Sequence, residues 1–286
     1  MAESVVARIA SVFLIALLFQ ARAVAQISTP TLIVGIDHIP VVVANLEKAQ
    51  ADFRSMGFSI KPGRPHADGI RNAHVKFPDG TEIELITAPA AVDALTTEYR
   101  AKIKKSDGPV YFGLYAPDRT ALAVKLRMGG FDVHDDDNST LTFPSASPLH
   151  PLFFGGRNKS PTDKPEYFAH ENSAVRLSAL WVRDDRELRK LFRDLGMPLT
   201  PVHHCAPISK SGSSAATLPE GNVYLVPSAS ANVVVARVEV RSLATLESVL
   251  KKNRVMIARR IACDPGAIWI SPKIAHGIWL EFVGPH

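Results

Sequence analysis

Acidic side chains interrupt a segment that otherwise reads as a buried strand. Glu82 and Glu84 lie in a run of isoleucine and leucine, and side chains two apart on a strand share one face. Burying a carboxylate is costly unless it is paired, binds a metal or faces a wet cavity. The two acids therefore indicate either a solvent-facing edge strand or a strand that lines a functional cleft.

A second acid occupies an equivalent position near the end of the chain. Glu281 falls within the apolar residues 278–283 as Glu84 falls within residues 83–86. A solvent-facing edge strand explains one such acid easily, and two at equivalent positions less well. His38 lies near the start of an earlier predicted strand, and imidazole with carboxylate suits Fe, Mn, Ni or Zn. A lone strand histidine is also often a hydrogen-bonded structural residue, so both readings stay open.

The elements that must position these side chains recur four times along the chain. Each copy begins with a predicted strand, which is rich in Val and Ile in the first copy, continues with a helix and ends with further strands. Such recurrence predicts repeated supersecondary units, although an unrelated α+β chain is the alternative. The first strands are expected at 35–43, 110–114, 175–182 and 233–240, and the closing strands at 82–87, 152–154, 223–226 and 278–283.

The order of several short motifs resembles a known superfamily. The motifs are Gly35-Ile36-Asp37-His38-Ile39, a helix ending in Gly57-Phe58, Pro62–His66 with Arg71–Ala73, the acidic strand 82–86, and His170-Glu171-Asn172-Ser173-Ala174. In this order they resemble the vicinal oxygen chelate superfamily and, more narrowly, its glyoxalase-like domain family. The resemblance covers roughly residues 33–286.

The resemblance implies an α+β fold of repeated βαβββ modules, paired so that curved mixed sheets enclose a cleft. The first glyoxalase-like half is expected at residues 33–155, a linker at 156–172 and the second half at 173–286. By position in the family pattern, His38, Glu84 and Glu281 match metal ligands, and His170 is a further candidate. Glu84 or Glu281 is the candidate catalytic base. The closing strands of copies two and three are apolar, so at most one metal site is expected.

Polar residues after the first helix are candidates for binding a substrate. Arg64, His66, Arg71 and Asn72 lie in a loop beside the expected cleft and could bind a carboxylate or carbonyl group. Polar loop residues are more often simply solvated. The cluster His203-His204-Cys205 resembles a metal site only superficially.

The resemblance therefore implies a metal-dependent lyase, isomerase or dioxygenase that acts on a small oxygenated molecule with one divalent ion (Fe, Mn, Ni or Zn). The alternative, from another class, is a metal-free protein that binds or sequesters a small molecule in the same cleft. The sequence contains no G-x-S-x-G, phosphate-binding Gly-rich or H-E-x-x-H motif.

The amino terminus and the charge pattern bear on localisation and partners. Residues 9–19 are apolar and precede Ala23-Val24-Ala25, a small-x-small cleavage signature. We expect residues 1–25 to be a signal peptide and the mature protein to be periplasmic or secreted, with no membrane association after cleavage. A disulfide between Cys205 and Cys263 is allowed in that compartment. The net charge of +5 is scattered, and the run at 102–105 is typical of a solvated helix end, so no nucleic-acid partner is expected.

Overall fold

The computed structural model describes residues 31–135, 140–157, 159–202, 212–227, 229–258 and 266–285. The described elements belong to one compact unit, Leu32–His286. The expected signal peptide, the segment His203-His204-Cys205 and Cys263 lie outside the described residues. Among the helices that are described, none is both long and apolar enough to cross a membrane.

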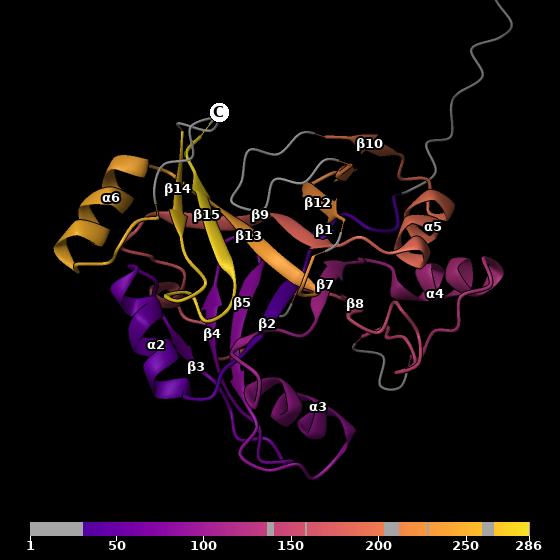
Figure 1. Ribbon diagram of the computed structural model, residues 1–286, viewed down its shortest axis with the longest axis horizontal. Helices are drawn as coiled ribbons and strands as arrows, with labels where there is room; N and C mark the ends of the chain where they lie inside the picture. Colours follow the sequence, from indigo (N-terminus) through magenta and orange to yellow (C-terminus); the bar gives the residue numbers. More distant parts are fainter. Residues whose placement is uncertain are drawn as a thin grey trace, which may run out of the picture. The chain divides into compact units, whose positions relative to one another are not determined.

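The first module forms a five-stranded sheet with one helix (Figure 1). The strand order is β3-β4-β5-β2-β6, in which β2 and β5 are parallel and the other pairs are antiparallel. The helix begins after Asn45, whose side chain accepts a hydrogen bond from the Lys48 amide, a typical N-cap. The elements are β2 (His38–Val42), α2 (Leu46–Ser55), β3 (Lys61–Pro62), β4 (Arg71–Lys76), β5 (Glu82–Thr87) and β6 (Gly108–Pro109).

The second module forms a smaller sheet, to which the first module contributes its short initial strand. The order is β1-β7-β8, with β7 and β8 parallel. Residues 140–143 make only isolated bridges, such as Leu141 with Phe154. The elements are β1 (Gly35–Ile36), β7 (Phe112–Tyr115), α4 (Arg119–Met128) and β8 (Leu152–Gly155), and α3 (Ala94–Ile103) lies in the chain between the two modules.

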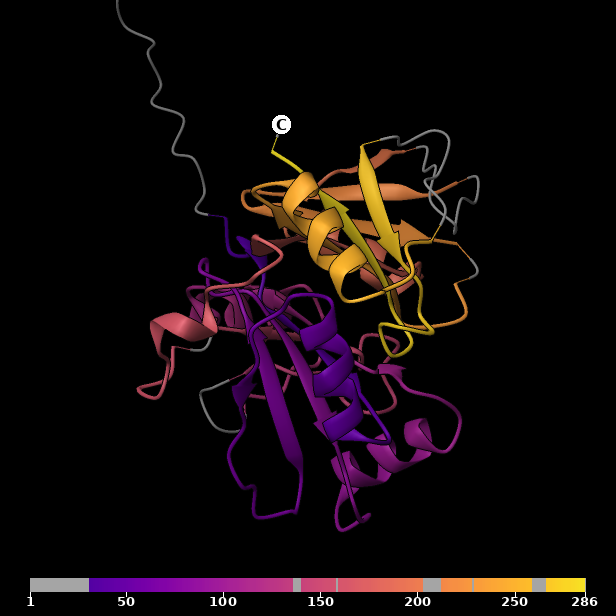
Figure 2. The ribbon, with the colours of Figure 1, turned by 90° about the vertical axis from the view of Figure 1, so that its left-hand side faces the viewer.

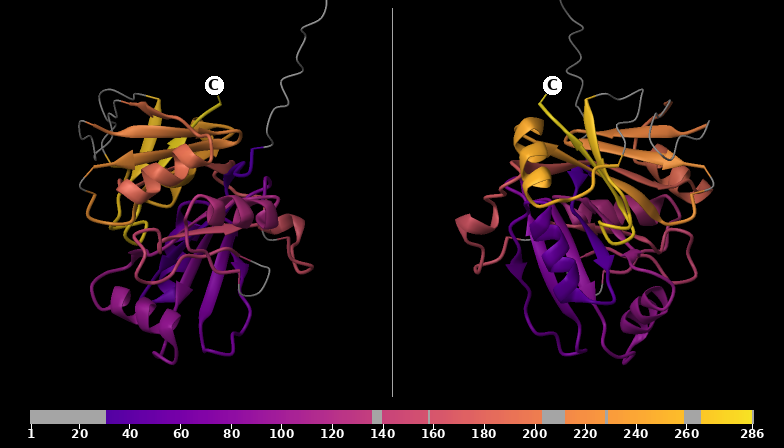
Figure 3. Two further views of the ribbon diagram at one scale, coloured as in Figure 1. Left: turned by 90° about the vertical axis from the view of Figure 1, so that its right-hand side faces the viewer. Right: turned by 60° about the vertical axis from the view of Figure 1, so that its left-hand side comes forward.

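The third and fourth modules share a seven-stranded sheet of order β10-β11-β12-β9-β13-β15-β14. Figures 2 and 3 show α5 and α6 beside the orange and yellow strands of this sheet. The elements are β9 (Ala174–Arg183), α5 (Arg186–Asp194), β10 (Leu199–Pro201), β11 (Ser214–Leu218), β12 (Gly221–Val226), β13 (Val233–Val240), α6 (Leu243–Lys252), β14 (Ala267–Ile270) and β15 (Trp279–Val283). The linker contains one 3-10 turn, η1 (Pro165–Tyr167).

All four modules share one pairing rule. The first strand of each module pairs in parallel with its last strand: β2 with β5, β7 with β8, β9 with β12, and β13 with β15. Parallel neighbours need a long crossover, and the helix with its following strands supplies it. The repeat predicted from the sequence and the mixed α+β fold class are therefore confirmed.

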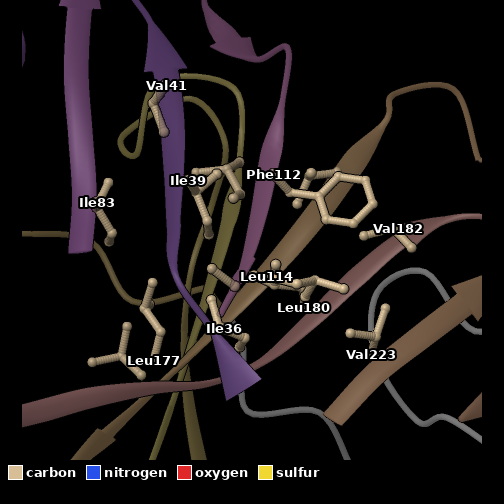
Figure 4. Packing of buried hydrophobic residues seen from close by; sticks show 14 of the residues in the cluster. Ile36, Ile39, Val41, Ile83, Phe112, Leu114, Leu177, Leu180, Val182 and Val223 are labelled. Carbon is tan, nitrogen blue, oxygen red and sulfur yellow. The ribbon is translucent and has the colours of Figure 1, made fainter. Parts of the chain in front are cut away.

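One hydrophobic cluster runs through both halves. Figure 4 shows Ile36 and Leu114 of the first half in the same cluster as Leu177 and Leu180 of β9, and all four are fully buried. Thr81, also fully buried, accepts a hydrogen bond of 2.9 Å from the Leu177 amide. The two halves therefore share a core within Leu32–His286.

Candidate functional site

One face of the first sheet carries the polar side chains that the sequence singles out. His38 lies opposite Glu82 across the β2–β5 pair, and Glu84 lies opposite His74 across the β4–β5 pair. Residues that face each other in a sheet point to the same side, so these four side chains share a face. The intervening residues, such as Ile83, point into the hydrophobic core.

This polar face is the floor of a cleft of about 580 Å³. The linker lies along the cleft and contributes residues 159–162, Lys164 and Tyr167 to its lining. Five residues expected at the site from the sequence line this cleft, namely His38, Arg64, His66, Asn72 and Glu84. The lining also contains Glu82, the second acid of the predicted strand, and three residues that the sequence did not single out: Lys61, His74 and Lys76.

Asp37 orients the His38 ring. The His38 Nδ1 donates to a carboxylate oxygen of Asp37 at 2.9 Å, and the ring packs against Phe153 with centroids 4.8 Å apart. Burial works against the charged imidazolium, but the hydrogen bond to Asp37 and the nearby carboxylates outweigh it and raise the pKa of His38 to about 9. A metal ion therefore competes with a proton for Nε2 at neutral pH.

Glu84 faces the free edge of the His38 ring. Its Oε2 lies 3.8 Å from His38 Nε2, which is too long for a hydrogen bond, and its Oε1 accepts from Asn72 Nδ2 at 2.7 Å. Each of the two groups is thus held by a partner of its own, Asp37 or Asn72. This resembles the outer-shell support that orients metal-binding histidines and carboxylates.

His74 and Glu82 form a second imidazole–carboxylate pair on the same face. His74 Nδ1 and Glu82 Oε1 lie 2.5 Å apart. Burial alone would raise the pKa of Glu82, but the hydrogen bond and charge of His74, with the charges of His38 and Lys76, lower it. Glu82 is therefore ionised at neutral pH, and it adds negative charge next to His38.

Asp37 is the main contributor that sequence reasoning missed. It is buried, and its second oxygen accepts from the Arg157 amide at 2.6 Å. A Cβ at Gly155 would lie 2.1 Å from Asp37 Oδ2, and one at Gly113 would lie 3.2 Å from its Cβ. The adjacent Asp-His dipeptide was the available signal, but the niche depends on β7 and β8, which are distant in the sequence.

His170 does not reach the cleft lining. Its Nδ1 accepts from the Ser59 amide and its Nε2 donates to the Lys76 carbonyl, both at 3.0 Å. Burial lowers the pKa of His170 to about 4, although the bond to Lys76 opposes this. The neutral ring uses both nitrogens to join the linker to the first sheet.

Glu281 lies on β15 in the seven-stranded sheet and is paired there. Only 2% of its surface is exposed, and its Oε2 accepts from Arg237 Nε at 2.6 Å. Glu281 is paired with Arg237 of β13, and Glu84 is paired with Pro40 of β2. His38 lies two residues before Pro40, so Val235, two residues before Arg237, occupies the equivalent position. The fourth module keeps the acid but has an aliphatic residue in place of the histidine.

Arg71 points away from the cleft. It alternates with Asn72 along β4 and forms an ion pair with Glu47 of α2 at an exposed position. These contacts therefore do not support the expectation that Arg71 binds a substrate.

The four expected metal ligands are not brought into one group. Within the described ranges, no cluster of three or more His, Cys, Asp or Glu side chains is arranged to hold a metal ion. His38 and Glu84 remain together, and they fit two positions of a divalent ion. A four-coordinate ion would need two further donors from substrate or water.

The comparisons with known proteins agree with this architecture. Residues 36–196 match the glyoxalase-like domain family. A comparison with curated proteins gives no match.

Solved structures with similar folds include three that cover most of this chain. A hypothetical protein from Staphylococcus aureus has a TM-score of 0.59 and 13% identity, over 88% of this chain and 100% of that chain. Catechol 2,3-dioxygenase has a TM-score of 0.62 and 14% identity, over 88% of each chain. A mutant of 4-hydroxymandelate synthase from Streptomyces coelicolor has a TM-score of 0.61 and 10% identity, over 89% of this chain and 93% of that chain. At these identities the likeness concerns the fold. The family match, which spans more than half of the chain, shows that this protein belongs to the glyoxalase-like domain family.

Proposed function

We propose that this protein is an enzyme, a dioxygenase or a related lyase or isomerase, that acts on a small oxygenated molecule in the first-half cleft. His38 and Glu84 bind one divalent metal ion there. The fold shared with catechol 2,3-dioxygenase supports the reaction class. A fold alone does not determine a reaction, so the proposal depends on the site itself.

The observation that carries the proposal is the distance between His38 Nε2 and Glu84 Oε2. The 3.8 Å between these atoms is too long for a hydrogen bond and is compatible with two ligands of one ion at about 2.1 Å each. Asp37 and Asn72 fix the ring and the carboxylate from behind. Such supported groups lose little entropy when they bind.

The chain's own residues have distinct parts in this proposal. A bound divalent ion would polarise a substrate carbonyl or stabilise negative charge that develops on an adjacent oxygen. Phe153 covers one side of the His38 ring and limits the access of water. Glu82 is ionised and lies next to His38, so it adds negative charge that favours a bound cation at this point.

A metal-free binding protein is the second candidate function. One observation favours it: the described part of the chain provides only His38 and Glu84 where three protein ligands are usual in catalytic sites. In that case the charged His38 ring and the lysines of the cleft would bind an anionic ligand directly.

Metal analysis of the purified protein separates the two functions. We expect close to one equivalent of a divalent metal in the wild type by inductively coupled plasma mass spectrometry, and less than about a tenth of that in His38→Ala and Glu84→Gln. The matched control is His150→Ala, because His150 pairs with Glu98 outside the cleft lining. The control should keep its metal. A folded wild type that takes up no metal from Fe, Mn, Ni or Zn solutions overturns the enzyme proposal.

A further inference from the structure

We infer that Lys61 and Lys76 form a subsite for a carboxylate or similar anionic group of the substrate, and that Asp163 of the linker fills this subsite when substrate is absent. The inference rests on the proposed function in taking the cleft as the substrate site. It adds that the substrate carries an anionic group, and that Asp163 competes with this group for the two lysines.

Two ammonium groups converge on one carboxylate at the side of the cleft. Lys61 Nζ lies 2.5 Å from Asp163 Oδ1, and Lys76 Nζ lies 2.7 Å from Asp163 Oδ2. The lysine residues are only 7% and 2% exposed. Two buried like charges repel each other and lose hydration, so the pair requires an anion at this point. A carboxylate of the sheet also lies near this pair, because Glu82 Oε2 is 3.9 Å from Lys76 Nζ.

The lysines and the carboxylate come from different kinds of structure. Lys61 and Lys76 project from β3 and β4, which belong to the hydrogen-bonded sheet, whereas Asp163 lies in a linker turn. The turn itself is closed by the Ser160 amide, which donates to Asp163 Oδ2 at 2.9 Å. The two cations are therefore held by the sheet, whereas the anion belongs to a connecting loop, the kind of segment that generally moves more readily.

Asp163 is a fully ionised anion in this position. Burial would raise its pKa, but hydrogen bonds from Lys61, Lys76 and the Ser160 amide outweigh it and lower the pKa to about 2. Its sequence neighbours Thr162 and Lys164 line the cleft. A substrate carboxylate entering the cleft would present the same oxygens to the same two lysines.

The charge of the cleft favours an anionic ligand. Its lining contains five lysine and arginine residues against two glutamates; these are Lys61, Arg64, Lys76, Lys159 and Lys164, and Glu82 and Glu84. An excess of positive charge in a cleft raises the local concentration of anions.

The spacing of the strands sets the size of the substrate. Lys76 on β4 is in register with Glu82 on β5, which is in register with His38 on β2. Two interstrand spacings amount to roughly 10 Å. A molecule with an anionic group at the lysines and oxygen atoms at His38 and Glu84 therefore needs only a short body.

Asp163 competes with the substrate as a tethered carboxylate. A group attached through a short loop acts at an effective concentration in the millimolar range or above, so it weakens the apparent affinity of a free anion. Its removal should strengthen anion binding. Binding of malonate to the wild type requires that Asp163 be displaced, which a purely structural ion pair would not permit.

Calorimetric titration with malonate tests the subsite on metal-depleted protein. We expect Asp163→Asn to bind malonate about tenfold more tightly than the wild type, because the internal competitor is lost. Lys61→Met should lose malonate binding, and the neutral probe malonamide should bind to none of the proteins. The matched control is Asp194→Asn, which removes the partner of Lys190 on α5 and should leave malonate affinity unchanged.

Two further measurements keep the outcome decisive. Malonate should raise the unfolding temperature of Asp163→Asn more than that of the wild type, because it replaces the missing anion. In His38→Ala, malonate binding should persist even though metal binding is lost, so the subsite and the metal proposal can fail separately. Equal or weaker malonate binding in Asp163→Asn, or unchanged binding in Lys61→Met, overturns the inference.

Discussion

Asp37 shows how one buried carboxylate can determine what its neighbour does. Its two oxygens are engaged by the His38 ring and by the Arg157 amide. Its side chain fits because Gly113 and Gly155 leave space on the neighbouring strands. The orientation of His38 therefore depends on two residues that have no functional group.

Gly155→Ala tests this dependence. The new Cβ would lie 2.1 Å from Asp37 Oδ2, so Asp37 must move and His38 loses its hydrogen bond. Loss of such an outer-shell partner typically weakens metal binding by about 10–100-fold, and we expect a decrease of that size in a competition titration with a chelator. Gly156→Ala is the control, because its Cβ meets only the flexible Arg119 guanidinium. If Gly155→Ala is folded and binds metal like Gly156→Ala, Asp37 does not orient the site.

The sequence indicated which residues lie in the cleft better than it indicated which residues pair with one another. His38 and Glu84 were recognisable because polar groups inside apolar strands are unusual. The pairing of Glu281 with Arg237 was not, since it requires the register of β13 against β15. The linker carboxylate Asp163 has no periodic pattern that could have identified it.

The end of the segment that joins the halves is held to the first half by His170 and Asn172. His170 bonds to the Ser59 amide and the Lys76 carbonyl, while Asn172 donates from Nδ2 to the Met56 carbonyl at 2.9 Å. Both residues thereby fasten the linker to the end of α2 and to the first sheet. The motif at residues 170–174 has a physical reason that does not involve chemistry on a substrate.

The pH dependence of stability tests the role of His170. Its pKa of about 4 in the folded protein lies below the ordinary 6.5, so below pH 6.5 the unfolded chain takes up a proton that the folded chain refuses. This contribution to stability is complete above pH 6.5 and is lost progressively as the pH falls toward 4. We expect it to cost about 2 kcal/mol between pH 7 and pH 5.

Urea unfolding at the two pH values gives the measurement. In His170→Gln this part of the pH dependence should disappear, so the difference between pH 7 and pH 5 should shrink by about 2 kcal/mol relative to the wild type. An identical pH dependence in both proteins would show that His170 is solvated instead of buried and neutral.

Elements whose apolar residues recur at a regular spacing were predicted from the sequence. Strands that depend on pairing with a neighbouring strand were not. The helices α2, α4, α5 and α6 lie where apolar residues recur at helical spacing. The segment 140–143 has strand composition, but it finds only isolated bridges to Phe154 and His134. A strand needs a neighbour with free backbone groups, and no local pattern states whether one is present.

For the molecule as a whole, the shared core has a thermodynamic consequence. Phe58 of the first half stacks on Phe282 of the second, with ring centroids 5.9 Å apart, and both rings are buried. Neither half could unfold alone without exposing apolar surface of the other. We therefore expect Leu32–His286 to unfold in one cooperative step.

The distribution of tryptophan makes this expectation easy to check. The three tryptophans of the chain, Trp181, Trp269 and Trp279, all lie in the second half, whereas far-UV circular dichroism reports on both halves. The urea midpoints from fluorescence and dichroism should coincide. Phe58→Ala should lower both midpoints equally, by a stability loss of about 3–5 kcal/mol. Separate midpoints would contradict a single cooperative unit.

The register of the fourth module has a consequence for design. Experiments that remove His38 or Glu84 test whether each is necessary, but they cannot test whether the pair is sufficient. Val235 and Glu281 occupy the positions of His38 and Glu84 in an equivalent pair of parallel strands. The His–Glu pair could therefore be introduced at this second position of the same protein. Histidine at position 235, with Arg237 replaced by a smaller residue to release Glu281, would rebuild the pair in a second setting within one molecule.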